Sequence, residues 1–174
     1  MDAATEQVPR PVLPRFLAGL QGGMVAAFWM LIWLGISGMW MRRSFWSAAN
    51  IMATALKGDA AITPGFGNGT IAGIALYLVI YSLLGALFAL LAARRLTGLG
   101  TFLASILFAL VWYWLWFRVI AVRAMPLLWL LHPEKSTEFG HVIFGALLAR
   151  YGDYLPRPPI VLPALPEFIA EGAD

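Results

Sequence analysis

The sequence contains no cysteine, and this absence removes several kinds of chemistry at once. A chain without thiols forms no disulfide bond, offers no thiolate to a metal and has no cysteine nucleophile. It holds only two histidines, His132 and His141, and a zinc ion would find no third ligand. No stretch resembles the serine motif G-x-S-x-G, the zinc motif H-E-x-x-H or a phosphate-binding loop. We therefore expect a protein that is not an enzyme.

Charge is also scarce. Only 12% of the residues are charged, whereas soluble domains carry roughly a quarter. The long apolar segments 16–41, 70–93 and 99–122 contain no Asp, Glu or Lys, and ion-coupled transport usually needs such groups at mid-membrane. The basic residues lie mostly at the ends of apolar runs, which is typical of headgroup anchors rather than of a nucleic-acid surface. We expect membrane lipids, and no nucleic acid, as partners.

Hydrophobic residues make up 61% of the chain, and the mean hydropathy is +0.79. This composition belongs in lipid. Segments 16–41, 70–93 and 99–122 each exceed the roughly 20 residues that cross a bilayer, so we predict three transmembrane helices there. Only RRLTG separates the last two, which predicts a tight antiparallel hairpin. The fold class we predict is an all-α integral membrane protein.

A fourth span is less plain in the sequence. The purely apolar run FGHVIFGALLA has 11 residues and would reach only about 16 Å. If Pro133 is the first helical residue and Glu134 lies in the first turn, a helix over 133–151 extends about 28 Å. We predict a four-helix bundle; the alternative is three spans with a re-entrant or surface helix.

Small residues and tyrosines recur at helical spacing on the predicted spans. Such a face lets the backbone of a neighbouring helix approach closely, and buried phenols need partners inside the bundle. The predicted helix-packing residues are Gly19, Gly23, Gly73, Tyr77, Tyr81, Gly85 and Gly145.

Residues 44–57 predict an amphipathic helix lying in the membrane surface, with Trp46 at the lipid interface. Its apolar side holds Phe45, Ala49, Met52 and Leu56, and its polar side holds Ser47, Asn50, Thr54 and Lys57. The alternative is that the apolar side covers a partner subunit.

Near the end of the third span, Arg118 is predicted to reach the interface beside Trp114. A role for Arg118 in binding substrate or lipid phosphate is the alternative.

His141 is the one candidate cofactor ligand. It shares a helix face with Gly145, and a glycine one turn away would let a flat ring approach the imidazole. A neutral imidazole there could bind the metal of haem or a chlorophyll-type pigment. The alternative is that Gly145 admits a neighbouring helix while His141 hydrogen-bonds a backbone carbonyl or a tyrosine. A bound lipid is the third possible cofactor.

Both ends of the chain are rich in proline, which favours extended structure over helix. We predict an extended arm over 1–15 and an extended tail over 153–174. The tail is also apolar, unlike a solvated linker, and is predicted to bind a partner. The partner-binding residues we predict are Pro158, Pro159, Leu162, Leu165 and Phe168.

The segments GTIAGIALYLVIYSLLGALFALL, WYWLWF and GHVIFGALLARY resemble a group of uncharacterised bacterial four-helix inner-membrane proteins, over roughly residues 17–152. This resemblance implies a multi-pass fold in the bacterial inner membrane, with no activity attached. We expect a non-catalytic accessory subunit of a larger membrane complex, such as an electron-transfer or photosynthetic assembly. A pigment- or haem-binding subunit using His141 and a small transporter or lipid-handling protein are the alternatives.

Overall fold

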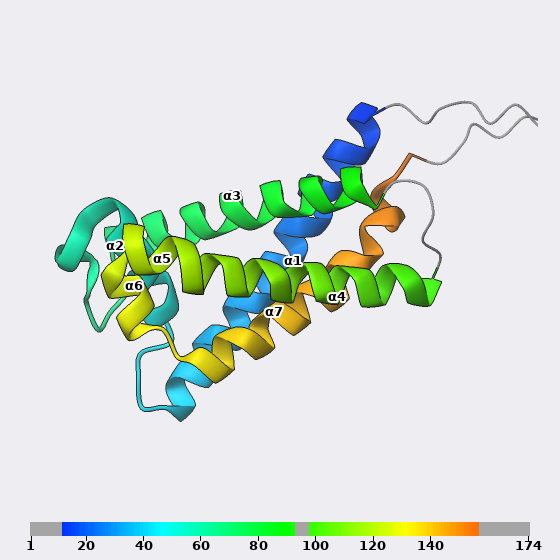
Figure 1. The fold of residues 1–174 in the computed structure, drawn as a ribbon. Helices are drawn as coiled ribbons and strands as arrows, with labels where there is room; N and C mark the ends of the chain where they lie inside the picture. The colour runs from blue at the N-terminus through cyan, green and yellow to red at the C-terminus, as the bar shows by residue number, and fades with distance from the viewer. Residues whose placement is uncertain (1–11, 93–97, 157–174) are drawn as a thin grey trace, which may run out of the picture.

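The computed structural model describes residues 12–92 and 98–156, and every regular element within them is a helix. The longer helices run side by side along the molecule, and most of the short ones gather at one end (Figure 1). The elements, in chain order, are α1 (Val12–Trp40), α2 (Ser47–Lys57), η1 (Gly58–Ala61), α3 (Asn68–Leu91), α4 (Gly98–Leu115), η2 (Trp116–Ile120), α5 (Ala121–Ala124), α6 (Pro126–Leu131), α7 (Glu134–Leu148) and η3 (Ala149–Tyr154).

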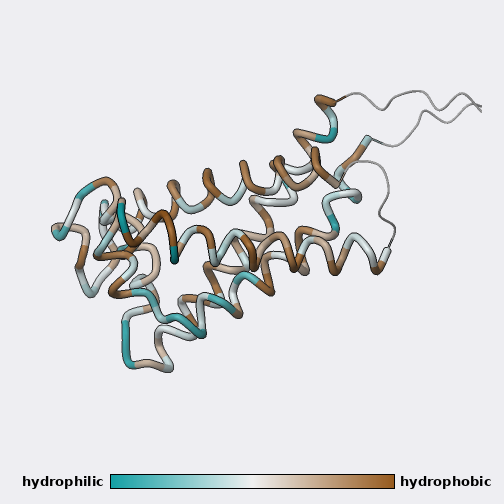
Figure 2. The backbone as a smooth tube through the Cα atoms, in the orientation of Figure 1, coloured by the Kyte–Doolittle hydropathy of each residue, from teal (hydrophilic) through white to brown (hydrophobic). Residues whose placement is uncertain are grey.

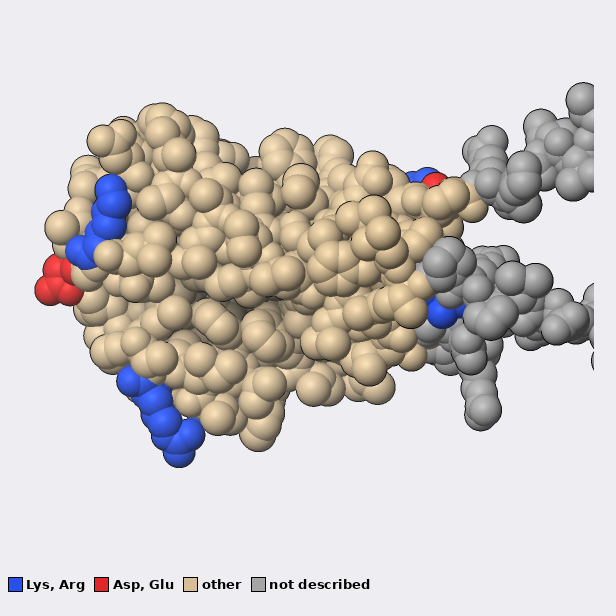
Figure 3. Space-filling model, turned by 90° about the horizontal axis from the view of Figure 1, so that it is seen from above, with Lys and Arg blue, Asp and Glu red and all other residues tan. Residues whose placement is uncertain are grey.

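Three helical stretches are long and apolar enough to cross a membrane: Val12–Trp40, Asn68–Leu91 and Gly98–Ala124. They coincide with the three spans predicted from the sequence, apart from a few residues at their ends. Charged residues lie at the two ends of the face drawn in Figure 3, with a long uncharged band between them. Hydrophobic positions likewise dominate the middle of the long helices, and hydrophilic ones gather in the connections and at the start of α7 (Figure 2).

The N-terminal boundary corrects one prediction. Helix α1 begins at Val12, so residues 12–15 of the predicted extended arm are helical. Pro14 lies in the first turn, where its missing N–H has no partner within the helix to lose. The proline-based argument was therefore wrong for these four positions. At the other end, Asp153 and Tyr154 belong to the 3-10 helix η3 rather than to an extended tail.

Helix α1 is the centre of the bundle, because α3 and α7 both pack along it. Met30, Phe144 and Leu148 are almost completely buried between these helices. Helix α4 packs closely on α7, whereas its backbone stays apart from that of α3. Side chains bridge this gap, with Phe88 and Phe108 5.3 Å apart between ring centroids. The predicted close hairpin of 70–93 with 99–122 is thus replaced by pairing of α1 with α3 and of α4 with α7.

Helix α2 forms where the amphipathic helix is predicted, and it packs on α3. Ala49 and Met52 are buried as expected, but Leu56 is 62% exposed and Asn50 is only 2% exposed. The Asn50 amide donates to the Thr63 carbonyl at 2.7 Å and accepts from the Thr70 hydroxyl at 2.6 Å. Asn50 therefore lies on the inner side of α2, opposite to the prediction, because partners later in the chain satisfy its amide.

Candidate functional site

The imidazole of His141 lies inside the bundle, with both ring nitrogens in hydrogen bonds. Nδ1 is 2.8 Å from the carbonyl oxygen of Thr137, one turn earlier on α7. Nε2 is 2.8 Å from the hydroxyl of Tyr81 on α3. A carbonyl oxygen only accepts, so Nδ1 carries the proton and Nε2 accepts from the Tyr81 hydroxyl. The side chain is 0% exposed, and the geometry fixes it as one neutral tautomer.

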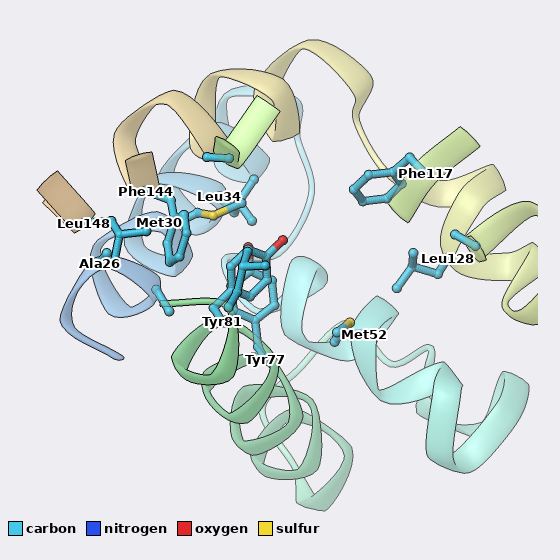
Figure 4. Packing of buried hydrophobic residues seen from close by; sticks show 14 of the residues in the cluster. Ala26, Met30, Leu34, Met52, Tyr77, Tyr81, Phe117, Leu128, Phe144 and Leu148 are labelled. Atoms are coloured by element: carbon cyan, nitrogen blue, oxygen red, sulfur yellow. The ribbon is translucent and has the colours of Figure 1, made fainter. Parts of the chain in front are cut away.

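Aromatic rings from three helices surround this imidazole. Tyr81 and Tyr113 have ring centroids 5.6 and 5.1 Å from that of His141, and Phe117 lies edge-on at 6.4 Å. Tyr77 stacks on Tyr81 at 4.4 Å. Figure 4 shows both tyrosines projecting from α3 into the buried cluster. The sequence indicated Tyr77, Tyr81 and His141, but not the contribution of Tyr113 and Phe117 from α4 and η2.

The residues around His141 do not fit a haem or a chlorophyll-type ring. Neither imidazole nitrogen is free, and a metal at Nε2 would have to displace Tyr81. The space beside Gly145 is also filled, since a Cβ there would lie 2.6 Å from the Cα of Ile106 on α4. Gly145 thus admits a neighbouring helix, and His141 bonds a carbonyl and a tyrosine, which is the alternative interpretation of the sequence. No cluster of three or more His, Asp or Glu residues in the described ranges could hold a metal ion.

The other predicted packing residues also lie where backbones approach. A Cβ on Gly19 would be 2.6 Å from the carbonyl oxygen of Gly85, and one on Gly23 would be 2.5 Å from that of Tyr81. Gly73 faces the backbone of Ala49 on α2. These glycines therefore form the seams between α1 and α3 and between α2 and α3.

A small cavity adjoins the stacked pair Tyr77 and Tyr81, at the end of the bundle that carries α2 and α6. Its volume is about 50 Å³, and its lining includes Leu34, Met52, Tyr77, Phe117, Leu128 and His132. Figure 4 labels all of these residues except His132, and each labelled residue comes from a different element. Two lining residues carry buried polar atoms without a hydrogen-bond partner, namely the hydroxyl of Tyr77 and Nε2 of His132. Ser82 and Trp112 carry the other two such atoms in the described residues.

His132 is held in one orientation at the wall of this cavity. Its ring stacks on Phe117 at 4.0 Å between centroids, and Nδ1 is 2.6 Å from the carbonyl oxygen of Trp129. Nδ1 therefore donates, and Nε2 presents a lone pair. Burial lowers the pKa of the His132 imidazole, although the Trp129 carbonyl and the Glu134 carboxylate partly oppose this effect. The ring thus favours its neutral form.

A second pocket of about 220 Å³ adjoins the first, because Phe117 and His132 line both. Its outer side carries an ion pair in which Arg118 donates to the Glu134 carboxylate at 2.9 Å. The Arg118 side chain is 60% exposed, and its partner Glu134 on α7 was not predicted from the sequence. Trp114 is 59% exposed, and Trp46 is half-buried against Phe45 and Phe66.

Residues Trp116–Ile120 of this region form the π-helix η2. A π-helix widens the helical turn locally, and such segments occur frequently at functional sites. Here it carries Phe117 and Arg118, which contribute to the pocket walls. Apart from the run of aromatic residues, no feature of the sequence indicated this π-helix. The predicted partner-binding residues Pro158, Pro159, Leu162, Leu165 and Phe168 lie outside the described residues.

Comparison with known proteins adds no assignment. No protein-family model matches the chain, and neither a curated protein nor a solved structure matches it. The resemblance to bacterial four-helix inner-membrane proteins therefore stays a prediction.

Proposed function

We propose that the chain crosses the membrane four times and acts as a non-catalytic accessory subunit that binds other integral membrane proteins through α4. The observation that carries the proposal is the poor coverage of α4 by the rest of the chain. In the most apolar window of the Gly98–Ala124 stretch, 22% of the residues are buried, against 44% for each of the other two spans. A helix held mainly by one neighbour has most of its surface left for a partner or for lipid.

The side chains on this uncovered surface form a continuous stripe. Leu103, Leu107, Val111 and Trp114 recur at intervals of three or four residues and are 56–64% exposed. Residues at this spacing lie on one side of a helix. A stripe of large side chains along one helix supports docking of a second helix, and aromatic residues are enriched at protein interfaces.

The path of α7 supports a fourth span. Its first turn lies at the level of Arg118 on η2, and Gly145 lies beside Ile106 on α4, more than three turns earlier in the chain. The chain then continues through η3, where Tyr151 meets Gly22 of α1 and the ring of Phe88 on α3. Helix α7 alone extends about 22 Å, and six residues of 3-10 helix add up to about 12 Å. Together these lengths match a hydrocarbon core of about 30 Å.

A pair of valines offers a matched test of the interface. Val111 and Val79 both lie near the middle of their apolar helical stretches, Gly98–Ala124 and Asn68–Leu91, and are both 56% exposed. A photo-reactive amino acid would be placed at each position in native membranes, and the cross-linked products would be identified by mass spectrometry. The expected result is a discrete protein adduct from position 111 and lipid adducts alone from position 79. Lipid adducts alone from both positions would contradict the proposal.

A further inference from the structure

The strongest unassigned feature is the outer pocket of about 220 Å³ near α6, which the accessory role proposed above does not use. Its walls combine one cation and one anion with aromatic rings, and the residues that supply these groups are Arg118, Glu134, Tyr113, Phe117 and Trp129. They come from the end of the third span, from α6 and from the first turn of α7. The fold therefore brings opposite charges and aromatic rings from separate parts of the chain into one pocket.

The pocket lies near the end of the predicted spans, where lipid headgroups are expected. Arg118 is within the last two turns of the Gly98–Ala124 stretch, and Glu134 begins α7. Charged side chains also gather at the two ends of the face drawn in Figure 3. Arginine and aromatic side chains at the end of a span commonly lie among the headgroups. A lipid that reaches this pocket therefore presents its headgroup to it.

The ion pair in this pocket can bind a further molecule. Nη2 of Arg118 donates to Oε1 of Glu134 at 2.9 Å, and the two side chains are 60% and 61% exposed. Within the described residues, this is the one hydrogen bond that either charged group makes to another side chain. A guanidinium has five N–H donors and a carboxylate has two accepting oxygens. Both groups therefore keep hydrogen-bonding capacity that a ligand could use.

A ligand with one negative and one positive group suits this pair better than a simple ion. An anion beside Arg118 would also approach Glu134, and a cation beside Glu134 would approach Arg118, so either ion meets a like charge. A zwitterion avoids this conflict, because its anion can lie beside Arg118 and its cation beside Glu134. The four charges then alternate in sign, so each group has only opposite charges as its nearest neighbours.

The remaining walls favour the positive group of such a ligand. The charged groups that act on Tyr113 are Glu134, Glu138 and Arg118, so carboxylates outnumber cations there. Aromatic rings also attract ammonium groups, and three of them line the pocket. Trp129 and Leu130, which are 41% and 69% exposed, add an apolar edge. This edge suits the glycerol and first acyl carbons of a lipid rather than a small soluble zwitterion.

We propose that this pocket binds the headgroup of a zwitterionic phospholipid with a primary ammonium, as in phosphatidylethanolamine. The phosphate accepts hydrogen bonds from Arg118, and the ammonium donates to the Glu134 carboxylate beside the aromatic walls. A primary ammonium is favoured over a quaternary one, because only the primary group has N–H bonds to donate. The pocket exceeds the roughly 150 Å³ of a cavity that binds benzene, so a compact headgroup fits.

The test measures the affinity of the first bound lipid for the purified full chain in detergent, by native mass spectrometry. The probes are dioleoyl phospholipids with ethanolamine, choline or glycerol headgroups, so only the headgroup changes. The variants are Arg118→Ala and Glu134→Ala. Arg150→Ala and Asp153→Ala are the matched controls, because they break a second exposed ion pair, at 3.0 Å, whose residues do not line this pocket.

The wild type and both controls should bind the ethanolamine lipid about fivefold more tightly than the choline lipid, since one hydrogen bond separates the two. Glu134→Ala should abolish this preference and favour the anionic glycerol lipid, because Arg118 is then left without its carboxylate. Arg118→Ala should weaken the binding of all three lipids about fivefold, a modest loss because the group is exposed.

Three results would overturn the proposal. Equal affinity of the wild type for the ethanolamine and choline lipids would remove the role of the ammonium, as would an unchanged preference in Glu134→Ala. Equal losses in Arg118→Ala and Arg150→Ala would show that surface charge alone attracts lipid. Displacement of the ethanolamine lipid by an equal concentration of free phosphoethanolamine would show that the site takes the soluble headgroup, which contradicts a lipid site.

Discussion

Replacing Tyr81 with phenylalanine should destabilise the bundle, whereas the same replacement at Tyr77, one turn earlier on α3, should not. The two tyrosines are close to ideal controls for each other. Both are almost fully buried, at 4% and 6% exposed, and their rings stack at 4.4 Å. They differ in hydrogen bonding, because the Tyr81 hydroxyl donates to Nε2 of His141 and the Tyr77 hydroxyl has no partner within hydrogen-bond distance among the described residues.

The magnitude follows from what each variant leaves behind. Tyr81→Phe removes a hydrogen bond and leaves a buried imidazole nitrogen unsatisfied, which costs about 1–3 kcal/mol in water-soluble proteins. Hydrogen bonds between membrane helices average about 0.6 kcal/mol and reach about 1.7 kcal/mol. We therefore expect a loss of about 1–2 kcal/mol. Tyr77→Phe removes a buried hydroxyl that gains nothing, so the free energy of unfolding should stay the same or rise by up to about 1 kcal/mol.

The assay is reversible unfolding of the purified protein in mixed micelles by a denaturing detergent, followed by circular dichroism in the far ultraviolet. Repeating Tyr81→Phe in a His141→Phe background isolates the pairwise interaction, because the hydroxyl then has no imidazole to satisfy. In that background the Tyr81 hydroxyl is itself buried without the imidazole, so Tyr81→Phe should leave the free energy of unfolding unchanged or raise it by up to about 1 kcal/mol. Equal losses for Tyr77→Phe and Tyr81→Phe would refute the assignment of the buried network.

Two further predictions concern packing and pH. Gly145→Ala should destabilise the protein by about 1–3 kcal/mol in the same unfolding assay, since the new methyl group meets the backbone of Ile106. Gly152→Ala is the control, because its methyl group would meet no atom within 4 Å, and it should be neutral or mildly stabilising. The pKa of His132 is lowered by burial in the folded protein, so the unfolded chain binds the proton more readily. Stability from this residue is complete above the unfolded pKa of about 6.5 and is lost as the pH falls below it. Glu134 and Arg118 are the charged groups that face this imidazole. Between about pH 7.5 and 5.5, the free energy of unfolding should therefore decline less in His132→Gln than in the wild type. An identical decline would contradict the prediction.

The sequence predicted the long helices well, because uninterrupted apolar runs leave few other structures for the chain in lipid. Small-residue spacing on each helix also identified the glycines at the seams, since close backbone approach is a property of one helix face. The pairing of helices was predicted less well. A short connection indicated that α3 and α4 form a hairpin, but the approach of two backbones depends on small residues on both, and the predicted glycines of α3 face α1 and α2.

Long-range partners explain the remaining differences. Helical periodicity placed Asn50 on the outer side of α2, yet its amide is satisfied by Thr63 and Thr70, 13 and 20 residues later. A periodicity count considers each side chain alone and assigns a polar one to water. In the same way, the sequence around His132 does not indicate that its ring stacks on Phe117, because that contact depends on how α6 returns to the bundle. The pockets could not be derived from sequence for this reason.

The distribution of satisfied and unsatisfied polar groups is informative in itself. Asn50 with Thr70 joins α2 to the start of α3, and Tyr81 with His141 joins α3 to α7, so these pairs hold neighbouring helices in register. Folding alone would favour a phenylalanine at position 77, where the hydroxyl finds no such partner. The contrast between Tyr77 and Tyr81, one helical turn apart, therefore separates the polar groups of this cluster that hold two helices in register from those that do not.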